Sequence, residues 1–409
     1  MGPDDSASIG VDDIRNAAAV VADVIKHTPV VASLSLTHRA GGEVVLKAEN
    51  LQVTGAFKIR GATNKLATLQ RRGTLAGVTA ASAGNHALAL ASAAREAHVP
   101  CEIFVPIGAP ITKIEAAQQF GAVIHEVAPS LEDALTLAVA WSEESGYVLC
   151  HPYDDPAVIA GQGTLGLELL DDIDDLATVI VPLGGGGLAS GIAIAVKSAR
   201  PQVRVVGVQT VACAPYAGGT PRSGPIATLA DGIAVKHPGI VTGPLVEQWL
   251  DEVVTVDEEA IADAMVLLMD RAKLYVEGAG AVGVAALLAG TVVPAASGTT
   301  CVVLSGGNVD LGVVPGLIRR HETSAGRRLV VFAKIDDRPG GLAQLLAVFG
   351  AAGANLIAVE HLREGVNLHV RETEVHCTFE VRGHDHAVAI IEAAKAAGYD
   401  DVRVDSPVR

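Results

Sequence analysis

Short, uniformly apolar segments alternate with segments of helical spacing through most of the chain. A strand without polar alternation is buried on both faces, which is typical of a parallel sheet covered by helices. The alternation therefore predicts an α/β fold of two lobes. The expected strands lie at 44–46, 78–81, 101–105, 123–127, 178–183, 203–208 and 300–304.

Composition limits the core and the partners. Half of the 409 residues are hydrophobic, only 3% are aromatic, and 44 are glycine. We therefore expect close helix–sheet layers of small aliphatic side chains. The formal net charge is −16 and the few Lys and Arg form no patch, so we expect no nucleic acid and no membrane partner. The acidic cluster Asp171, Asp172, Asp174 and Asp175 is expected to be a solvated loop.

The cysteines and the N-terminus predict a cytoplasmic protein. The five cysteines are far apart and form no C-x-x-C pair, which favours free thiols and argues against a disulfide or zinc framework. The N-terminal segment lacks the basic flank and apolar run of a signal peptide. No charge occurs between Glu277 and Asp310, but Pro294 interrupts that stretch. It is interpreted as a buried helix, a turn and a buried strand.

A change of composition at 319–328 marks a second domain. Polar residues replace the apolar pattern there, and we take 321–328 as a linker between a domain at 1–320, whose smaller lobe covers roughly 53–155, and a module at 329–409. The order of expected elements in the module is βαββαβ, which is a ferredoxin-like arrangement. These elements lie at 329–335, 341–352, 356–361, 374–381, 385–397 and 401–404.

Lys58 lies where an apolar helical pattern begins, just after Gly55. The N-terminus of a helix is the positive end of its dipole, so a lysine there is disfavoured as a cation. The same field lowers the pKa of the amine, which suits a neutral nucleophile. An isolated lysine is more often a surface residue whose stem covers apolar atoms. Other segments favour the chemical interpretation.

A run of four glycines, 184–187, follows one expected strand and opens a helix. Exposed backbone N–H groups beside a helix N-terminus form a phosphate cradle, although a tight turn without a ligand is the simpler alternative. The pattern Gly184-x-Gly186-x-x-Ala189 also fits a dinucleotide fingerprint. That fingerprint requires an acid about twenty residues later, and the next strand ends at Gln209. A simple phosphate ester is therefore the better ligand.

Two polar loops follow other expected strands. Residues 82–86 (Ser-Ala-Gly-Asn-His) lie between a strand and a helix, where Ser82 or Asn85 could be an ordinary N-cap. A loop at the carboxyl end of a parallel strand is also where such folds bind ligands, and its N–H groups suit a carboxylate. Residues 305–308 (Ser-Gly-Gly-Asn) end another strand, and a simple turn explains their composition equally well.

Taken together and in order, these segments resemble the two-lobed fold-type II pyridoxal-phosphate enzymes, whose fold is that of the tryptophan synthase β chain. The match is closest to threonine dehydratases (threonine ammonia-lyases) that carry one C-terminal ACT domain. The resemblance covers nearly the whole chain. Its motifs lie at 55–62, 82–86, 182–188, 228–232, 276–281, 305–308 and 337–342.

The resemblance implies a site for pyridoxal 5'-phosphate and an amino acid. Lys58 would bind the cofactor covalently, Phe57 would pack beside its ring, Asn85 would contact the ring hydroxyl and Ser305 the ring nitrogen. The phosphate would lie against Gly184, Gly185, Gly186, Gly187 and Leu188. The substrate carboxylate would be framed by Ser82, Ala83, Gly84, Asn85 and His86.

The implied reaction is elimination from L-threonine, and also L-serine, to 2-oxobutanoate (or pyruvate) and ammonia, as the first step of isoleucine synthesis. The freed Lys58 amine would remove the α-proton. Related serine racemases carry a serine where Ala83 stands, so dehydration is favoured over racemisation. Gln209 replaces an acid of a cation site found in some relatives, so no metal is expected. A serine or hydroxyaspartate dehydratase, a racemase-like enzyme and a sensor with a decayed catalytic lobe remain alternatives.

The C-terminal module resembles ACT domains, which bind amino acids at a loop between paired domains. Arg338, Gly340, Gly341 and Asn355 would form this effector site, and the effector would be isoleucine or valine. A purely dimerising module is the alternative, because fold alone does not fix function. We expect a homodimer or homotetramer.

Overall fold

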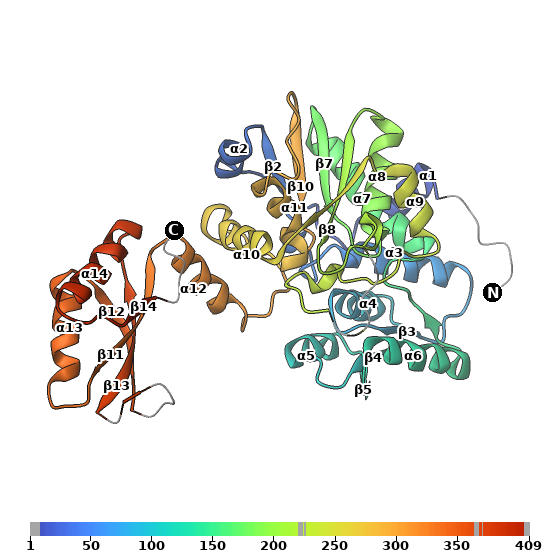
Figure 1. Ribbon diagram of the computed structural model, residues 1–409. Helices are drawn as coiled ribbons and strands as arrows, with labels where there is room; N and C mark the ends of the chain where they lie inside the picture. Colours follow the sequence, from blue (N-terminus) through green and yellow to red (C-terminus); the bar gives the residue numbers. More distant parts are fainter. Residues whose placement is uncertain (1–8, 220–223, 225, 364–367, 370, 405–409) are drawn as a thin grey trace. The chain divides into compact units, whose positions relative to one another are not determined.

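The computed structural model describes residues 9–219, 224, 226–363, 368–369 and 371–404. The chain forms two compact units, Met1–Val309 and Asp310–Arg409, and each is described by itself. The first unit contains two lobes with a separate sheet each (Figure 1). This arrangement confirms the predicted α/β class with a two-lobed first part.

The larger lobe is built on a six-stranded sheet in the order β1-β2-β10-β7-β8-β9. All neighbouring strands are parallel except β1 and β2. The strands are β1 (Val30–Ala32), β2 (Val44–Lys47), β7 (Leu176–Pro182), β8 (Arg204–Thr210), β9 (Glu252–Val256) and β10 (Thr299–Val303). Because neighbouring strands run parallel, β7 and β10 end at the same edge of the sheet.

Helices cover both faces of this sheet (Figure 1). Apolar residues of α7 (Pro156–Asp172) and α8 (Gly187–Ala199) pack on the face formed by Val179 and Val303. On the other face, α11 (Gly278–Leu288) lies so close that a Cβ at Gly283 would be 2.6 Å from Val302. The remaining helices of the lobe include α1 (Val11–Val21), α2 (Leu34–Ala40), α9 (Thr242–Trp249) and α10 (Glu258–Leu267).

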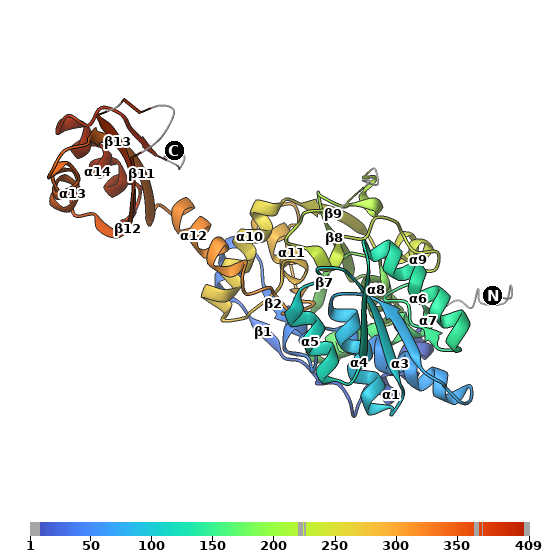
Figure 2. The same ribbon diagram turned by 90° about the horizontal axis from the view of Figure 1, so that it is seen from below.

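The smaller lobe contains a parallel four-stranded sheet in the order β5-β4-β3-β6. Figure 2 shows its helices around the sheet. A core of small aliphatic residues joins α3, α4 and α5 to one face, and α6 packs on the other. The elements are α3 (Lys58–Arg71), β3 (Val78–Ala81), α4 (Asn85–Glu96), β4 (Cys101–Pro106), α5 (Ile111–Gln119), β5 (Val123–Ala128), α6 (Leu131–Ser145) and β6 (Val148–Leu149).

The second unit contains the predicted βαββαβ module. Its four strands pair antiparallel in the order β12-β13-β11-β14, and the rings of Phe349 and Phe379, tilted to each other with centroids 4.8 Å apart, lie in its core. The elements are α12 (Val314–Ser324), β11 (Arg328–Asp336), α13 (Gly341–Ala351), β12 (Asn355–Leu362), β13 (Glu372–Glu380), α14 (His384–Ala396) and β14 (Val402–Val404).

Two sequence-based expectations need correction. The segment 321–328 is not an irregular linker, because residues 321–324 complete α12 and Arg328 begins β11. The acidic cluster is not simply a solvated loop either. Asp172 ends α7, and its carboxylate lies 2.9 Å from the buried Lys47 Nζ and 2.8 Å from His27 Nε2. The polar composition concealed both features, because amphipathic helix ends and ion-paired acids look like loops in a linear sequence.

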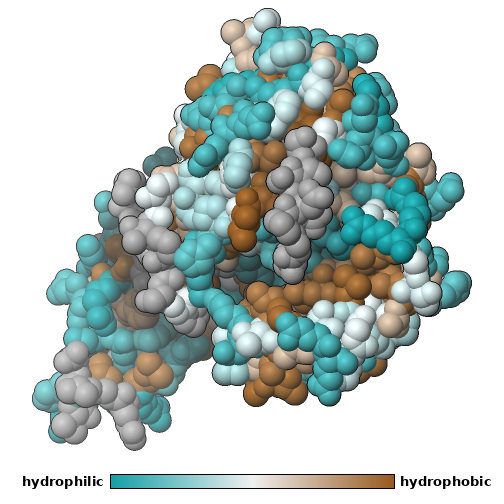
Figure 3. Space-filling view, turned by 90° about the vertical axis from the view of Figure 1, so that its right-hand side faces the viewer, coloured by the Kyte–Doolittle hydropathy of each residue, from teal (hydrophilic) through white to brown (hydrophobic). Residues whose placement is uncertain are grey.

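The surface shows hydrophilic residues with hydrophobic patches between them on the face drawn in Figure 3. Within the described ranges, no helix combines the length and apolarity needed to span a bilayer. The same residues contain no group of three or more His, Cys, Asp or Glu able to hold a metal ion. All five cysteines are free and buried.

Candidate active site

Lys58 is the first residue of α3, as the sequence predicted. Its Nζ donates a hydrogen bond to Pro152 O at 2.8 Å and lies 5.1 Å from the centroid of the Phe57 ring. Burial lowers the pKa of the amine to about 8, while the negative charge of Glu277 opposes this shift. A substantial fraction of the amine is therefore neutral near neutral pH, which is the form that attacks a carbonyl and accepts a proton.

The Lys58 turn is joined to the end of β10. The backbone N–H of Phe57 donates to Ser305 O at 3.0 Å, and Ala56 forms an isolated antiparallel bridge with Gly306. The N–H of Gly307 donates to Gly55 O at 2.8 Å. The structure therefore brings the predicted residues Phe57, Lys58 and buried Ser305 together.

The four glycines connect β7 to α8 in a tightly packed loop. Gly186 has a φ of +96°, where glycine is favoured. A Cβ at Gly185 would lie 2.3 Å from the Tyr153 ring, and one at Gly187 would lie 2.9 Å from Tyr153 O. A Cβ at Gly184 would be 2.9 Å from Ile233 Cα. Larger residues are excluded, and the glycine N-cap leaves the first N–H groups of α8 for a ligand.

The back of this loop is fixed by side chains that sequence analysis did not single out. Gly185 O accepts hydrogen bonds from Thr242 Oγ1 at 2.6 Å and from Tyr216 Oη at 3.2 Å. The Asp154 carboxylate accepts from three successive N–H groups at residues 240–242, at 2.8 to 2.9 Å. These bonds hold the start of α9 against the loop. The cradle thus has a rigid wall and donors suited to a phosphate.

Asn85, the first residue of α4, lies in a chain of hydrogen bonds. Its Nδ2 donates to Glu277 Oε1 at 2.7 Å, and its Oδ1 accepts from Asn308 Nδ2 at 2.8 Å. Asn308 also donates to Thr54 O at 2.9 Å. The loop after β3 is therefore connected to the loop after β10 and to the segment before Lys58.

Glu277 was not assigned from the sequence, which left helix capping and ion pairing open. It is the N-cap residue of α11, but its side chain makes no cap hydrogen bond. Burial raises the pKa of the carboxyl to about 7, the negative charge of Asp231 raises it further, and the hydrogen bond from Asn85 opposes the shift. Its position at the edge of a long uncharged stretch was the available sequence signal.

The loop at residues 82–86 is partly exposed except for its last residue. Ser82 Oγ accepts from Gly84 N at 3.2 Å, so this loop begins with a local turn. The His86 ring is buried and its Nε2 lies 2.8 Å from Cys150 O. Burial lowers the pKa of His86 to about 3, and the positive charge of Lys58 adds to the shift. Its imidazole is neutral and bonded to backbone, so only the N–H of His86 remains to bind a ligand.

Comparison with known proteins identifies the chemistry. Residues 21–306 match the family described as pyridoxal-phosphate dependent enzyme. The chain belongs to this family. It is 41% identical over 397 residues to the L-threonine ammonia-lyase of Thermotoga maritima, a match that covers 96% of this chain and 98% of that protein.

Solved structures support the same assignment of the first unit. A threonine deaminase, whose source is given as T.th., has a TM-score of 0.69 and 38% identity, and the match covers 74% of this chain and 99% of that one. Maize serine racemase has a TM-score of 0.71 and 36% identity, with coverages of 76% and 97%. The fold alone therefore does not separate elimination from racemisation.

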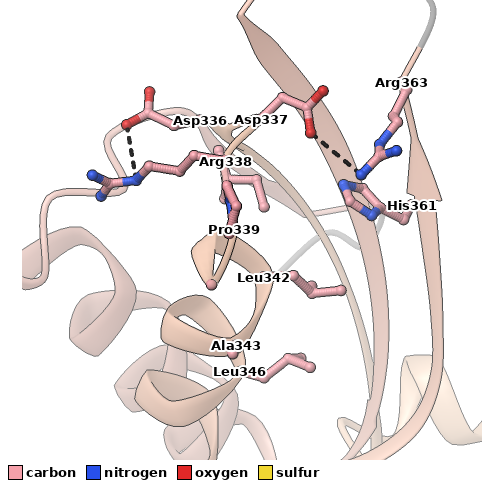
Figure 4. Close-up of a pocket in the computed structure, with 11 residues that line it drawn as sticks. Asp336, Asp337, Arg338, Pro339, Leu342, Ala343, Leu346, His361 and Arg363 are labelled. Atoms are coloured by element: carbon pink, nitrogen blue, oxygen red, sulfur yellow. Dashed lines mark ion pairs between the residues drawn. The ribbon is translucent and has the colours of Figure 1, made fainter.

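The second unit contains a separate pocket of about 520 Å³ at the loop between β11 and α13 (Figure 4). Leu342 and Leu346 give it an apolar wall, and Asp337 pairs with Arg363 at 3.4 Å across its rim. Two of the predicted effector residues, Arg338 and Gly340, line it. Gly341 begins α13 beside the pocket. Asn355 does not line it and instead donates to Glu380 Oε2 at 2.9 Å.

Proposed function

We propose that the chain is a pyridoxal-phosphate-dependent L-threonine ammonia-lyase, which converts L-threonine to 2-oxobutanoate and ammonia. The observation that carries the proposal is the Lys58 amine. It is placed at the start of α3, is partly buried and is neutral in substantial part near neutral pH. The nearly full-length similarity to a curated L-threonine ammonia-lyase supports the substrate.

The residues present fit the cofactor. Gly184 to Gly187 and the first turn of α8 would hold its phosphate, because their N–H groups face an open N-terminus and no Cβ intrudes. Lys58 would bind its aldehyde, Phe57 and Asn85 would contact its ring, and Ser305 would contact the ring nitrogen. Pyridoxal phosphate, when bound, supplies the electron sink that makes the α-proton of the substrate acidic.

The side chains then determine the outcome. Lys58 Nζ would take the α-proton as a neutral amine. The N–H groups of the 82–86 loop would bind the substrate carboxylate and orient the α-carbon. Ser305 offers a hydroxyl to the ring nitrogen where an acid would hold it protonated. Ala83 has no proton to donate to the opposite face, which favours elimination over racemisation.

The test of this proposal is a pair of lysine variants. Lys58→Ala is expected to abolish 2-oxobutanoate formation and the visible absorption of the bound cofactor. Lys197→Ala, which removes a surface lysine paired with Asp251 at 2.7 Å, is expected to keep both. Retained turnover in Lys58→Ala would refute the assignment of Lys58.

The substrate is tested by a panel. Values of kcat/KM for L-threonine, L-serine and 3-hydroxyaspartate, with chiral analysis of any D-serine formed, separate the candidate reactions. We expect L-threonine to be preferred and L-serine to be a slower substrate. A preference for L-serine or hydroxyaspartate, or accumulation of the D-enantiomer, would favour the alternative enzymes.

We further propose that the second unit is a regulatory ACT domain that binds a branched-chain amino acid. The support is the pocket at the β11–α13 loop, which combines an apolar wall with charged groups at its rim. An amino acid with an aliphatic side chain presents the same combination. Titration of the full chain with L-isoleucine and L-valine should give saturable heat and a change in threonine turnover. No heat with either ligand would favour a purely structural module.

Self-association and cellular context complete the proposal. Every residue of the edge strand β12 is exposed, including Leu356 and Ile357. An open apolar edge favours pairing with another chain, which supports a homodimer or homotetramer. Five buried free thiols support a cytoplasmic enzyme, and its product would enter isoleucine synthesis. Multi-angle light scattering on the purified chain tests the oligomer, since a monomer at all concentrations would contradict it.

A further inference from the structure

Arg60 is completely buried two residues after Lys58, and its guanidinium is fully bonded. Its Nε and Nη2 each donate to one oxygen of Glu49 at 2.8 Å. Its Nη1 donates to Glu168 Oε1 at 2.6 Å and to Thr164 Oγ1 at 3.1 Å. The fork therefore ties the first turn of α3 to the segment after β2 on one side and to α7 on the other. Bidentate pairs of this kind fix direction as well as distance.

The same ions continue into a second buried cation. Glu168 Oε2 lies 2.7 Å from Lys47 Nζ, which also donates to Thr28 O at 2.8 Å and pairs with Asp172. Lys47 and Glu49 are, like Arg60, fully buried. Burying charges is costly, and an apolar cluster of equal volume often stabilises a fold as well or better. What the ions add at this place is a fixed geometry.

The first turn of α3 needs such support from outside. Its N-cap, Phe57, makes no side-chain cap hydrogen bond, and the cations Lys58 and Arg60 lie at the positive end of the helix dipole. The turn is also in close contact with α7, because a Cβ on Gly161 would lie 2.6 Å from Arg60 O. Residues two apart on a helix point about 200° apart. Arg60 thus holds the back of the turn whose front presents Lys58.

We propose that Arg60 is a positioning residue, whose clamp on Glu49 and Glu168 sets the direction of the Lys58 amine. The inference rests on the proposed role of Lys58. A tilt of the first turn would move Lys58 Nζ away from Pro152 O and from the glycine loop. Misplacement by about 1 Å costs on the order of 100-fold in rate. The effect appears in kcat more than in KM, because the 82–86 loop still binds the substrate.

The test compares two buried cations of one network. Arg60→Lys keeps the charge and removes the fork, whereas Lys47→Met removes a cation that contacts the same Glu168 from β2. At saturating pyridoxal phosphate, we measure melting temperature, kcat, KM and the pH midpoint of the visible absorption of the cofactor bound to Lys58. The groups that affect this midpoint, Glu277, His86 and His151, are unchanged in both variants.

Both variants should lower the melting temperature, but only Arg60→Lys should lower kcat by about 100-fold and move the pH midpoint. If Arg60→Lys changes the melting temperature alone, or if Lys47→Met shifts the midpoint equally, Arg60 is merely structural and the inference fails. Should Arg60→Lys not fold, Glu49→Gln weakens the same clamp while keeping its shape, and it must then move the midpoint. Failure of the proposed function itself is recognised separately, by turnover in Lys58→Ala.

Discussion

Gly185→Ala is the sharpest structural test of the phosphate cradle. An added Cβ would lie 2.3 Å from the Tyr153 ring, although real Cβ contacts are essentially never below 3.0 Å. The φ of Gly185 is not in the left-handed range, so alanine meets no backbone strain there. The ring must therefore retreat by at least roughly 0.7 Å in a closely packed wall. The space next to it is the glycine loop itself.

The expected magnitude follows from the packing cost. Overpacking by one methyl group costs about 1–3 kcal/mol. If the ring relieves this strain by moving over the loop, the cost appears in cofactor affinity, which weakens about 5- to 150-fold. Titration of cofactor-free protein with pyridoxal phosphate, followed by absorption, measures this directly.

The matched control is Gly243→Ala in α9, where an added Cβ would meet only Pro238 Cβ at 3.6 Å. This variant should bind the cofactor as the parent does. Unchanged cofactor affinity in Gly185→Ala, together with a lower melting temperature, would show that Tyr153 relaxes away from the loop. The cradle would then not be where we place it.

Three further predictions address the network around Glu277, the α9 start and the second unit. Because burial raises the pKa of Glu277 to about 7 from 4.5, its favourable contribution is present below pH 4.5 and is lost as pH rises through about 7. Glu277→Gln should therefore remove up to about 3 kcal/mol of the fall in unfolding free energy across this window in cofactor-free protein, measured with denaturant, and an unchanged slope would count against it. Asp154→Ala leaves three N–H groups without their acceptor and should cost about 1–3 kcal/mol of unfolding free energy, more than Asp154→Asn; equal losses would contradict the carboxylate's role. Ala343→Leu should fill the pocket and weaken isoleucine or valine binding about 5- to 150-fold by calorimetry, with effector-free turnover unchanged; parent-like affinity would remove the pocket from the account.

Sequence patterns predicted those parts of the site that depend on position relative to a strand or helix end. Lys58 at the start of α3 and the glycines between β7 and α8 belong to this group. Both depend on local spacing, because the end of a parallel strand and the start of the next helix meet at the binding edge of an α/β sheet. The βαββαβ order of the second unit was predicted for the same reason.

Contacts between distant segments could not be predicted. Asn85 and Glu277 are separated by 192 positions and Arg60 and Glu168 by 108, and nothing in either local pattern marks a partner. The His86 ring was expected near the substrate, but its burial directs it to Cys150 O. Side-chain direction inside a loop depends on the packing of neighbouring elements, which linear spacing does not contain.

The central claim is that the Lys58 amine is the group that carries the cofactor. Reduction of the native, purified protein with borohydride, followed by peptide mass mapping, tests it most directly. We predict a phosphopyridoxyl group on the peptide that contains Lys58 and on no other lysine. An unmodified Lys58, or the group on Lys47 or Lys65, would contradict the account.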